Sequence, residues 1–409
     1  MTLLNNLIED LVAKVMKHEN YLTYKIADEG ENSAKGDGYL GEISFITVNA
    51  AKNGVRKPYH MVIKTAKTSD DFRMKTPIRE VFEREVYMYN TIFPAYKSFF
   101  NEYCVEFPKV NFPHIYASCL DNKRESIVLQ NLKTIGYDLH NRLMPMNLNH
   151  AHMVFAKYGQ FHGISLALRH KQSSVFRNLT KDMTDLFGIF LTQANMIPSL
   201  QTDFKYAMDL LRKLGRLDLV RKYEKCRFYE EMDKIATKST DPSDPASVIL
   251  HGDCWNNNFM FKYEGLTKEQ PTDMVFIDFQ LSRVASPIYD LSYFFYACCD
   301  RHIQSDLMFL LEVYHNNVTS ILKSFGCNVN DILPFEKLID HWKTFGKYGL
   351  IMSLFIVRIE LSHPNEAPDL ADIADKGNMD ECLSFKIANQ VQYDQRISDN
   401  YIQFAEQFL

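Results

Sequence analysis

The sequence is poor in cysteine, and the few cysteines it has are scattered. There are 8 among 409 residues, and none forms a C-x-x-C pair or another spacing typical of metal ligands. They lie at positions 104, 119, 226, 254, 298, 299, 327 and 382. This pattern excludes a disulfide-rich secreted scaffold and a zinc-binding module. Reduced thiols are typical of the cytosol, so we expect a cytoplasmic protein.

Long apolar runs and an excess of basic charge are also absent. No segment reaches the roughly 18 uninterrupted apolar residues of a membrane span. Residues 1–20 predict a short amphipathic helix, in which Glu9 and Asp10 interrupt what would be the apolar core of a signal peptide. The net charge is −5 and the pI about 6.2, with no run of Lys and Arg suited to nucleic acid. We expect no nucleic-acid partner, no membrane span and no obligate protein partner.

The hydrophobic pattern changes along the chain. Short strand-like runs dominate the first part, and Asn53-Gly54 between two of them is a strong β-hairpin signal. Thr76-Pro77 followed by "IREVFEREVYMYNTIF" predicts one helix among these strands. From Asn149 on, helical patterns dominate, apart from the strand-like runs "VIL" and "DMVFIDFQL". The sequence therefore predicts an α+β protein with a small N-terminal sheet lobe and a larger, mainly helical lobe.

The segment "SVILHGDCWNNNFMFKY" (247–263) carries the clearest chemical signal. Asp253 follows Gly252 at the end of a strand-like run, Asn258 lies five positions later, and Asp278 follows a second apolar run. Carboxylate and amide oxygens are ligands that Mg²⁺ prefers. In phosphoryl transfer one Asp accepts the hydroxyl proton, while an Asn and a second Asp hold the metal. We therefore expect Asp253 to be the catalytic base and Asn258 and Asp278 the magnesium ligands; a tight turn capped by Asp253 is the non-functional alternative.

A glycine-rich segment lies well upstream of these residues. In "GDGYLG", Gly36, Gly38 and Gly41 fit the pattern G-x-G-x-x-G. A dinucleotide-binding loop must be followed by a helix, whereas a strand-like run follows here. That context favours a flap over nucleotide phosphates. The alternative is a loop that needs positive φ at a glycine, and the negative charge of Asp37 counts against a phosphate site.

A lysine and a glutamate between the glycines and Asp253 complete the pattern. Lys64 lies within the apolar run "MVIKT", where a lysine needs a partner unless it faces water. Glu85 shares a helix face with Phe82 and Tyr89, which puts a carboxylate in an apolar stripe. An ion pair between Lys64 and Glu85 would satisfy both groups and direct the ammonium at nucleotide phosphates. Glu83 lies off that face.

In this order along the chain, the motifs resemble the ecdysteroid kinase-like (CHK kinase-like) family, relatives of aminoglycoside phosphotransferases, choline kinases and protein kinases. The resemblance covers nearly the whole chain. It rests on "FEREVYMY" around Glu85, "SIVLQNLKTIGYDL" (126–139), "FHGISLAL" (161–168), "LHGDCWNNNFMF" (250–261) and "FIDFQLSRVASPIYDLSYFF" (276–295). It implies a bilobal protein kinase-like fold and ATP- and Mg²⁺-dependent phosphorylation of a hydroxyl group. The roles expected above for Asp253, Asn258, Asp278, Lys64 and Glu85 agree with it.

The resemblance also implies a hinge between a nucleotide-binding lobe, 1–131, and a catalytic and substrate-binding lobe, 132–409. There the carbonyl of Gln130 and the N–H of Leu132 would bind adenine. This chain has Gln-Asn-Leu where the family usually has Glu-Asp-Leu, which puts a side-chain contact in doubt. Asp290 resembles a buried Asp that supports the catalytic loop, and His251 is expected to orient that loop.

The acceptor is the least defined part of this interpretation. The resemblance implies a lipophilic alcohol, such as an ecdysteroid, another steroid or a foreign compound. Aromatic residues make up 13% of the chain and permit an apolar pocket, without defining one. The candidate acceptor-binding residues are Phe294, Tyr296, Tyr348 and Phe355.

Other functions stay open on the sequence. A cationic acceptor such as choline or an aminoglycoside could use the acidic loop that contains Glu366, Asp369, Asp372 and Asp375, although a solvated surface loop is the simpler interpretation. A catalytically inactive pseudokinase has support only from Asp37 and the hinge. A lipophilic carrier would have no use for Asp253, Asn258 and Asp278 together.

Overall fold

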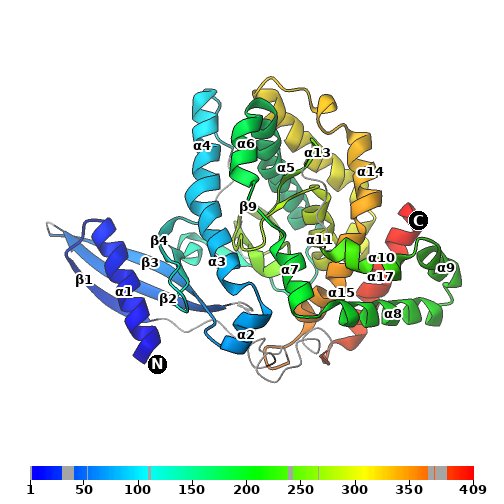
Figure 1. The fold of residues 1–409 in the computed structure, drawn as a ribbon, viewed down its shortest axis with the longest axis horizontal. Coiled ribbons are helices and arrows are strands. Elements are labelled where there is room, and N and C mark those ends of the chain that lie inside the picture. Colours follow the sequence, from blue (N-terminus) through cyan, green and yellow to red (C-terminus); the bar gives the residue numbers. More distant parts are fainter. Residues whose placement is uncertain are drawn as a thin grey trace.

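The computed structural model describes residues 2–29, 41–52, 54–108, 112–237, 243–265, 267–366, 373 and 385–409. The N-terminal part is built on a five-stranded antiparallel sheet in the order β1-β2-β3-β5-β4 (Figure 1). Its strands are β1 (Thr23–Glu29), β2 (Gly41–Lys52), β3 (Val55–Ala66), β4 (Ile115–Cys119) and β5 (Ser126–Gln130). The expected hairpin joins β2 to β3, where Lys52 pairs with Val55 and Gly54 has a φ of 79°.

Helices cover this sheet on both sides. The amphipathic segment at the N-terminus forms α1 (Thr2–His18), whose Leu11 and Val15 pack on Val48 and Met61 of the sheet. The helix expected after Thr76-Pro77 is α3 (Ile78–Tyr87), preceded by α2 (Asp70–Lys75). It runs through a π-helical turn, Met88–Ile92, into α4 (Phe93–Glu102). The amphipathic helix expected at 1–20 and the helix expected after Thr76-Pro77 are therefore both present, whereas α2 was not expected. α1 supplies the apolar layer on one side of the sheet.

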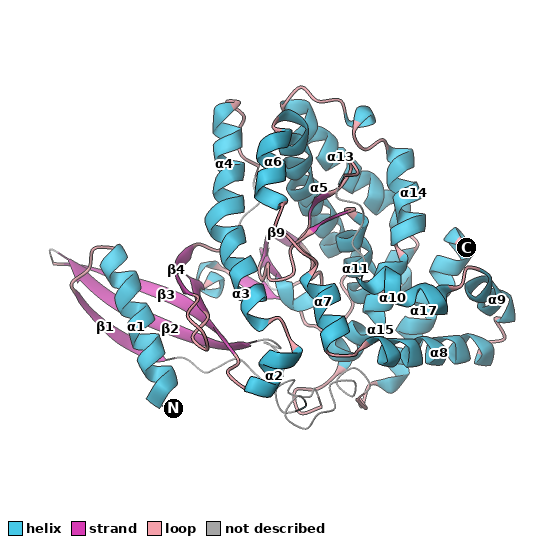
Figure 2. Cartoon of the chain, viewed as in Figure 1, coloured by secondary structure: helices cyan, strands magenta, loops and turns pink. Residues whose placement is uncertain are grey.

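The rest of the chain is mainly helical, as the sequence predicts (Figure 2). Its helices are α5 (Leu148–Lys171), α6 (Ser173–Thr180), α7 (Leu186–Gln193), α8 (Ile197–Lys213), α9 (Leu217–Lys225), α10 (Phe228–Thr237), α11 (Ile288–Cys298), α12 (Arg301–Gln304), α13 (Leu307–Ser324), α14 (Phe335–Phe345), α15 (Lys347–Leu361) and α17 (Gln390–Phe408). Among the described residues, none of these helices has both the length and the apolar character required to cross a membrane.

Two of these helices approach each other closely at glycine positions. A Cβ on Gly159 of α5 would lie 2.4 Å from the carbonyl oxygen of Tyr314 on α13, and one on Gly163 would lie 2.9 Å from Ile321. Both distances are too short for a side chain. The "YGQFHG" segment is therefore a packing surface, which fixes α5 against α13.

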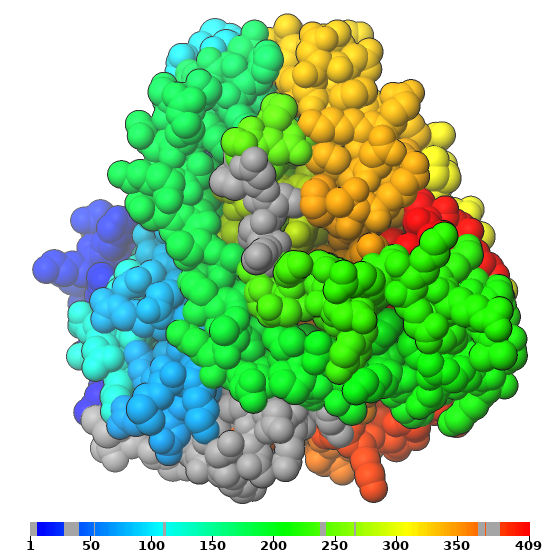
Figure 3. All heavy atoms as spheres, turned by 45° about the vertical axis from the view of Figure 1, so that its right-hand side comes forward, coloured from blue at the N-terminus to red at the C-terminus, as the bar shows by residue number. Residues whose placement is uncertain are grey.

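Short strands within the helical part carry the segments that contain Asp253 and Asp278. A three-stranded sheet, β6-β8-β9, contains β6 (Tyr137–Leu139), β8 (Phe259–Tyr263) and β9 (Pro271–Phe276). A two-stranded ladder pairs β7 (Val248–Ile249) with β10 (Val284–Ala285). The segments that contain Asp253 and Asp278 leave β7 and β9 respectively. Helices α8 and α9 pack against the C-terminal helix α17. The segment from α7 to α10, in green, covers much of the face seen in Figure 3.

Candidate active site

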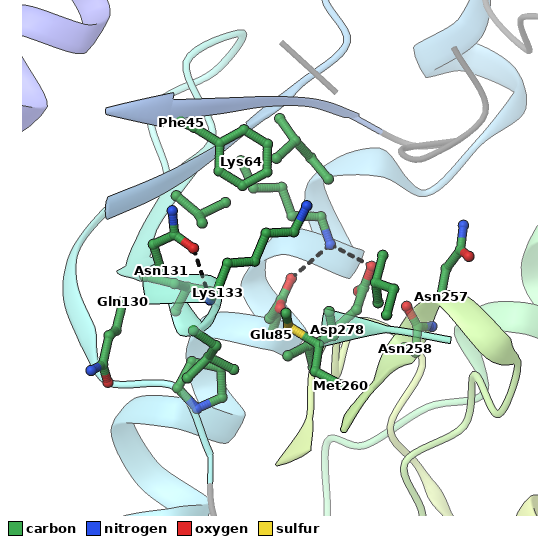
Figure 4. A pocket seen from close by; sticks show the side chains of 17 residues that line it. Phe45, Lys64, Glu85, Gln130, Asn131, Lys133, Asn257, Asn258, Met260 and Asp278 are labelled. Carbon is green, nitrogen blue, oxygen red and sulfur yellow. Dashed lines mark hydrogen bonds and ion pairs between the residues drawn. The ribbon is translucent and has the colours of Figure 1, made fainter. Parts of the chain in front are cut away.

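A cavity of about 430 Å³ lies between the N-terminal sheet and the β8–β9 hairpin (Figure 4). Apolar side chains form its two walls. Glu85, Asp278, Asn257 and Asn258 lie toward one end, and Gln130, Asn131 and Lys133 come from the other (Figure 4). Its lining includes Ile43, Phe45, Val62, Lys64, Glu85, Leu129, Gln130, Asn131, Leu132, Lys133, Leu139, Asn257, Asn258, Met260, Ile277 and Asp278. An apolar slot with convergent polar groups at one end is the usual form of a small-molecule or cofactor site.

Lys64 is the charged centre of this cavity. It lies on β3, 8% exposed, and its Nζ is 3.0 Å from Oε2 of Glu85 and 2.7 Å from Oδ2 of Asp278. Burial would lower the pKa of Lys64, but the charges of Asp278 and Glu85 outweigh it, so that the pKa is raised. The lysine is therefore an ammonium held between two carboxylates.

Glu85 reaches Lys64 because of the helix face that it occupies. It is 1% exposed, on the same side as the buried Phe82 of α3 and the buried Tyr89 of the π-helical turn that follows. The backbone N–H of Phe279 donates a further hydrogen bond to it. Glu83, in contrast, is on the outer face, where it pairs with Arg79 at 2.7 Å. The ion pair expected from the sequence is present, and the helix face was correctly predicted.

Asp253 is held by two hydrogen bonds to its carboxylate. Its Oδ2 accepts from Nδ2 of Asn258 at 2.8 Å, and its Oδ1 accepts from the hydroxyl of Tyr293 at 3.0 Å. Burial, followed by the charge of Asp278, raises the pKa of Asp253 to about 7, while the bonds from Tyr293 and Asn258 oppose that shift. A carboxylate with a pKa near neutrality is suited to accept a proton.

The backbone around Asp253 is held from below by a buried carboxylate. Asp290, on α11, accepts from the N–H of His251 at 2.7 Å and from the N–H of Gly252 at 2.9 Å. His162 donates from Nε2 to the same carboxylate at 3.1 Å. A Cβ on Gly252, whose φ is 91°, would lie 2.2 Å from the Leu281 carbonyl oxygen, so only glycine fits there.

His251 forms hydrogen bonds with the backbone of two segments, one at Asp253 and one just before Asp278. Its Nδ1 accepts from the N–H of Asp253 at 3.2 Å, so that Nε2 carries the proton and donates to the carbonyl of Ile277 at 2.9 Å. Burial lowers the pKa of His251, which keeps the ring neutral. The imidazole thus ties the Asp253 segment to the residue before Asp278, an arrangement that agrees with the orienting role expected for it.

Asn258 and Asp278 meet because β8 and β9 pair. Phe259 is opposite Phe276, and the N–H of Ile277 donates to the carbonyl of Asn258 at 3.1 Å. Asp278 then has a φ of 65°, a left-handed conformation that is uncommon for a non-glycine residue and typical of functional sites. The strand register therefore brings both side chains to the charged end of the cavity.

These two residues fit a magnesium ion. Oδ1 of Asp278 is buried and has no hydrogen-bond partner among the described residues. Nδ2 of Asn258 donates to both the carbonyl and the carboxylate of Asp253, which leaves its Oδ1 as a ligand. Within the described segments, no group of three or more His, Cys, Asp or Glu could hold a metal without help. Mg²⁺ accepts such sites, since it is commonly held by one or two carboxylates together with phosphates and water.

The hinge expected from the sequence borders the end of the cavity opposite Asn257 and Asn258 (Figure 4). Gln130 is the last residue of β5, and Leu132 is the first of a 3-10 turn, Leu132–Ile135. The first N–H groups of such a turn have no partner within it. Oδ1 of Asn131 accepts from the N–H of Lys133 at 3.0 Å and so caps the turn. An aspartate would do the same, which explains why asparagine is tolerated at this position.

The glycine-rich segment is only partly within the described residues. Gly36 and Gly38 lie outside them, and Gly41 begins β2, opposite Ala66. A Cβ on Gly41 would lie 2.5 Å from the carbonyl oxygen of Thr65. Gly41 is thus required by the close approach of β3, and its φ is not positive.

The four aromatic residues expected at the acceptor site divide into two groups. Phe294 and Tyr296 are fully buried: Phe294 packs on Phe155 and Phe259, and Tyr296 donates to Gln403 on α17. The structure does not bring these two to the site, because α11 turns them into the helical core. Tyr348 and Phe355 lie on α15 in an aromatic cluster that extends from Tyr293, which contacts Asp253.

Of the four acidic residues considered for a cationic acceptor, only Glu366 lies within the described residues. Glu366 accepts from the N–H groups of His363 and Ala388, each at 2.8 Å, and so closes the base of the loop. Asp369, Asp372 and Asp375 lie outside the described residues, as does Asp37.

Two residues of the site were not found from the sequence. Tyr293 lies one helical turn after Asp290 on α11, and this spacing was a usable signal, because it puts both side chains on the face toward Asp253. Asn257 lines the cavity, 8% exposed, and its Nδ2 has no hydrogen-bond partner among the described residues. The run of three asparagines pointed to the segment without separating the role of Asn257 from that of Asn258.

The chain was compared with curated protein sequences and with solved structures. No curated protein sequence matches it. Solved structures that match the chain include the GDP complex of a mutant aminoglycoside 2'-phosphotransferase-IIIa (13% identity, 95% of this chain and 97% of that one, TM-score 0.44). The wild-type GDP complex gives 13% identity, 96% and 97% coverage and a TM-score of 0.40. A GDP and kanamycin complex of the same type of enzyme gives 12% identity, 90% and 98% coverage and a TM-score of 0.38.

A family match carries more weight than these distant structures. The sequence profile of the Ecdysteroid kinase-like family matches residues 35–327, well over half of the chain and all of the motifs described above up to Asp290. The protein therefore belongs to the ecdysteroid kinase-like family, and is a small-molecule kinase with a kinase-like fold.

Proposed function

We propose that this kinase uses Mg-ATP to phosphorylate a hydroxyl group of a small lipophilic molecule, such as an ecdysteroid, another steroid or a foreign alcohol. One observation carries the proposal. Lys64, Glu85, Asn258 and Asp278 come from distant parts of the sequence and line one end of a single cavity, and Asp253 lies next to them, hydrogen-bonded to Asn258. Their types and arrangement are those that phosphoryl transfer needs.

One part of the cavity would bind the base of the nucleotide and another part its phosphates. Ile43, Val62 and Leu129 form one apolar wall and Met260 and Ile277 the other, a slot suited to a flat purine. The hinge backbone at Gln130 and Leu132 would hydrogen-bond adenine at the closed edge. Lys64 would then lie at the phosphates, where its ammonium stabilises the negative charge that develops during transfer.

Asn258 and Asp278 would hold magnesium beside these phosphates. A bound Mg²⁺ neutralises phosphate charge and fixes the geometry of the γ-phosphoryl group. The chain provides the ligand geometry in advance: Asp253 orients the Asn258 amide, and Lys64 holds one oxygen of Asp278 while the other remains available. Asn257 would add a neutral donor on the same side of the cavity.

Asp253 is the proposed base. The acceptor oxygen attacks the γ-phosphorus, its proton passes to the carboxylate of Asp253, and the bond to the β–γ bridging oxygen breaks to release ADP. The hydrogen bonds from Tyr293 and Asn258 fix the carboxylate in place, and its raised pKa makes it a stronger proton acceptor than an exposed aspartate.

The surroundings of Tyr293 favour a lipophilic acceptor over a cationic one. Tyr348 lies 6.4 Å from Tyr293 and 4.7 Å from Tyr289, ring centroid to centroid. An aromatic cluster of this kind could bind a quaternary ammonium. However, the buried guanidinium of Arg283 already lies 5.4 Å from the ring centres of both Tyr289 and Tyr348. Both rings therefore already have a cationic partner, which makes them less suited to a second cation such as choline.

The acceptor class can be tested by measuring ADP release with Mg-ATP across a panel of compounds. The panel contains ecdysteroids, other sterols, hydroxylated plant and drug-like compounds, choline and aminoglycosides. We expect turnover with lipophilic alcohols only, and none for Asp253→Asn, which keeps the shape of the side chain but removes the base. Turnover confined to choline or aminoglycosides would contradict the acceptor class. Turnover that survives in Asp253→Asn would contradict the base, and ATP binding without any turnover would support a pseudokinase.

The pH dependence of the reaction tests the environment of Asp253. Since the base must be ionised, kcat/KM should rise as the pH passes through about 7, the pKa of Asp253. The bond from Tyr293 stabilises the ionised form, so Tyr293→Phe should raise this pKa and move the acidic limb upward by about one pH unit. Tyr206→Phe, which removes a distant hydroxyl bonded to Asp394, is the control. An acidic limb that stays in place in Tyr293→Phe would show that Asp253 does not govern it.

The metal assignment predicts a loss of nucleotide affinity. Asp278→Asn should weaken the binding of Mg-ATP, measured by calorimetry, on the order of 10- to 100-fold, while binding of ATP in EDTA should not fall comparably. Asp273→Asn provides a matched control on the same hairpin, because Asp273 pairs with Lys157 at 2.8 Å and does not line the cavity. Wild-type affinity of Asp278→Asn for Mg-ATP would overturn the assignment.

A further inference from the structure

Arg84, the residue before Glu85 on α3, has a buried side chain that contacts the helical part of the molecule. Arg84 is 7% exposed, and its guanidinium donates to three backbone carbonyls. It reaches Thr184 at 3.1 Å, Asp182 at 3.2 Å and Ser282. All three acceptors belong to the helical part of the chain, about 98 to 198 positions away in sequence. Figure 1 shows α3 lying between the sheet and α7.

A second bond from α3 reaches the same region. Tyr87, one turn after Arg84, donates from its hydroxyl to the carbonyl of Leu179 at 2.8 Å. The segment that receives both side chains, 179–184, is itself fixed at its end. There Asp185 caps α7 by accepting from the N–H of Gly188 at 3.0 Å and pairs with Arg283 at 3.5 Å. Thus α3 is fastened to a rigid part of the molecule.

The Ser282 contact links Arg84 to the catalytic segment. The hydroxyl of Ser282 donates to the carbonyl of His251 at 3.1 Å, and the N–H of Leu250 donates to the carbonyl of Arg283 at 2.8 Å. The loop after Asp278 therefore joins α3 on one side to the segment that carries Asp253 on the other. Arg84 occupies the point where these three elements meet.

The chemistry of this contact requires arginine. Burial, followed by the neighbouring charge of Arg283, lowers the pKa of Arg84 to about 10, which still leaves it charged at neutral pH. A buried cation needs its donors satisfied, and a planar guanidinium can serve three carbonyls that lie in different directions. A lysine has a single nitrogen and cannot reach all three.

We propose that Arg84 is a positioning residue that acts through Glu85. By fastening α3 to the 179–184 segment and to the loop after Asp278, it holds Glu85 where it meets Lys64. The ion pair is then a fixed part of the fold rather than a contact made by moving α3. This inference rests on the proposed role of Lys64 and Glu85 in binding phosphates.

A double-mutant cycle tests it. Arg84→Lys should lower kcat/KM about tenfold, because α3 loses its fixed position. Glu85→Gln should lower it as well, and Arg84→Lys introduced into Glu85→Gln should then cost much less than tenfold, since the function of Arg84 is already lost. Arg79→Lys on the exposed face of α3 and Glu83→Gln are the matched controls. Additive losses from Arg84→Lys and Glu85→Gln would show that Arg84 acts on the fold generally and would overturn the inference.

Two further readouts keep the test decisive. If Arg84→Lys does not fold, Tyr87→Phe breaks only the second bond of α3; it should lower kcat/KM less than tenfold in the wild type and not at all in Glu85→Gln. An equal effect of Tyr87→Phe in both backgrounds would contradict the inference. If Glu85→Gln alone leaves kcat/KM unchanged, the proposed role of Glu85 fails, whereas an effect of Glu85→Gln with none of Arg84→Lys refutes the positioning role alone.

Discussion

The structure of the site depends on the burial of one ammonium group, that of Lys64. A buried cation is tolerated only when it is paired and hydrogen-bonded, and removal of a partner from such a pair typically costs about 3–5 kcal/mol. Lys64 is paired with Glu85 and Asp278, which belong to a helix and to the end of a β-hairpin in the other part of the molecule. The same charge thus fixes the position of α3 against β3 and the position of the Asp278 loop beneath both. The two ion pairs of Lys64 therefore bring β3, α3 and the Asp278 loop together.

The segment that contains Asp253 is joined to this arrangement by the hydrogen bonds of His251 and Asp290. His251 links the backbone at Asp253 to the residue before Asp278, and Asp290 holds the turn from below. Asp253 and Asp278 are left as two carboxylates close enough for the charge of one to raise the pKa of the other. A divalent cation and the acceptor proton are the charges that would relieve this repulsion. The strain of the left-handed Asp278 and the unpartnered Oδ1 are consistent with a site shaped for a ligand.

Much of this could be predicted from the sequence, because the determining signals are local. The Asn53-Gly54 turn, the apolar runs before Asp253 and Asp278, and the helix face of Glu85 each follow from a short stretch of residues. Arg84 gave no such signal, since its partners are backbone carbonyls up to 198 positions away, and a carbonyl is the same for every residue type. The four aromatic residues expected at the acceptor site could not be told apart for a related reason. Burial in the core and exposure in a pocket demand similar side chains, so Phe294 could not be separated from Tyr348 without the packing of α11 against α15.

The most direct test of the account is the loss of the Lys64 charge. Lys64→Met keeps an unbranched side chain on β3, and Lys57→Met is the control, because Lys57 lies on the same strand with its Nζ 4.4 Å from the Tyr59 ring centre. The measurement is kcat/KM for Mg-ATP, with an acceptor from the active class, on protein shown to be folded by circular dichroism. The account predicts a loss of roughly 100-fold or more for Lys64→Met and a small change for Lys57→Met. Equal activity of Lys64→Met and the wild type would contradict the claim that the buried ammonium serves the nucleotide phosphates.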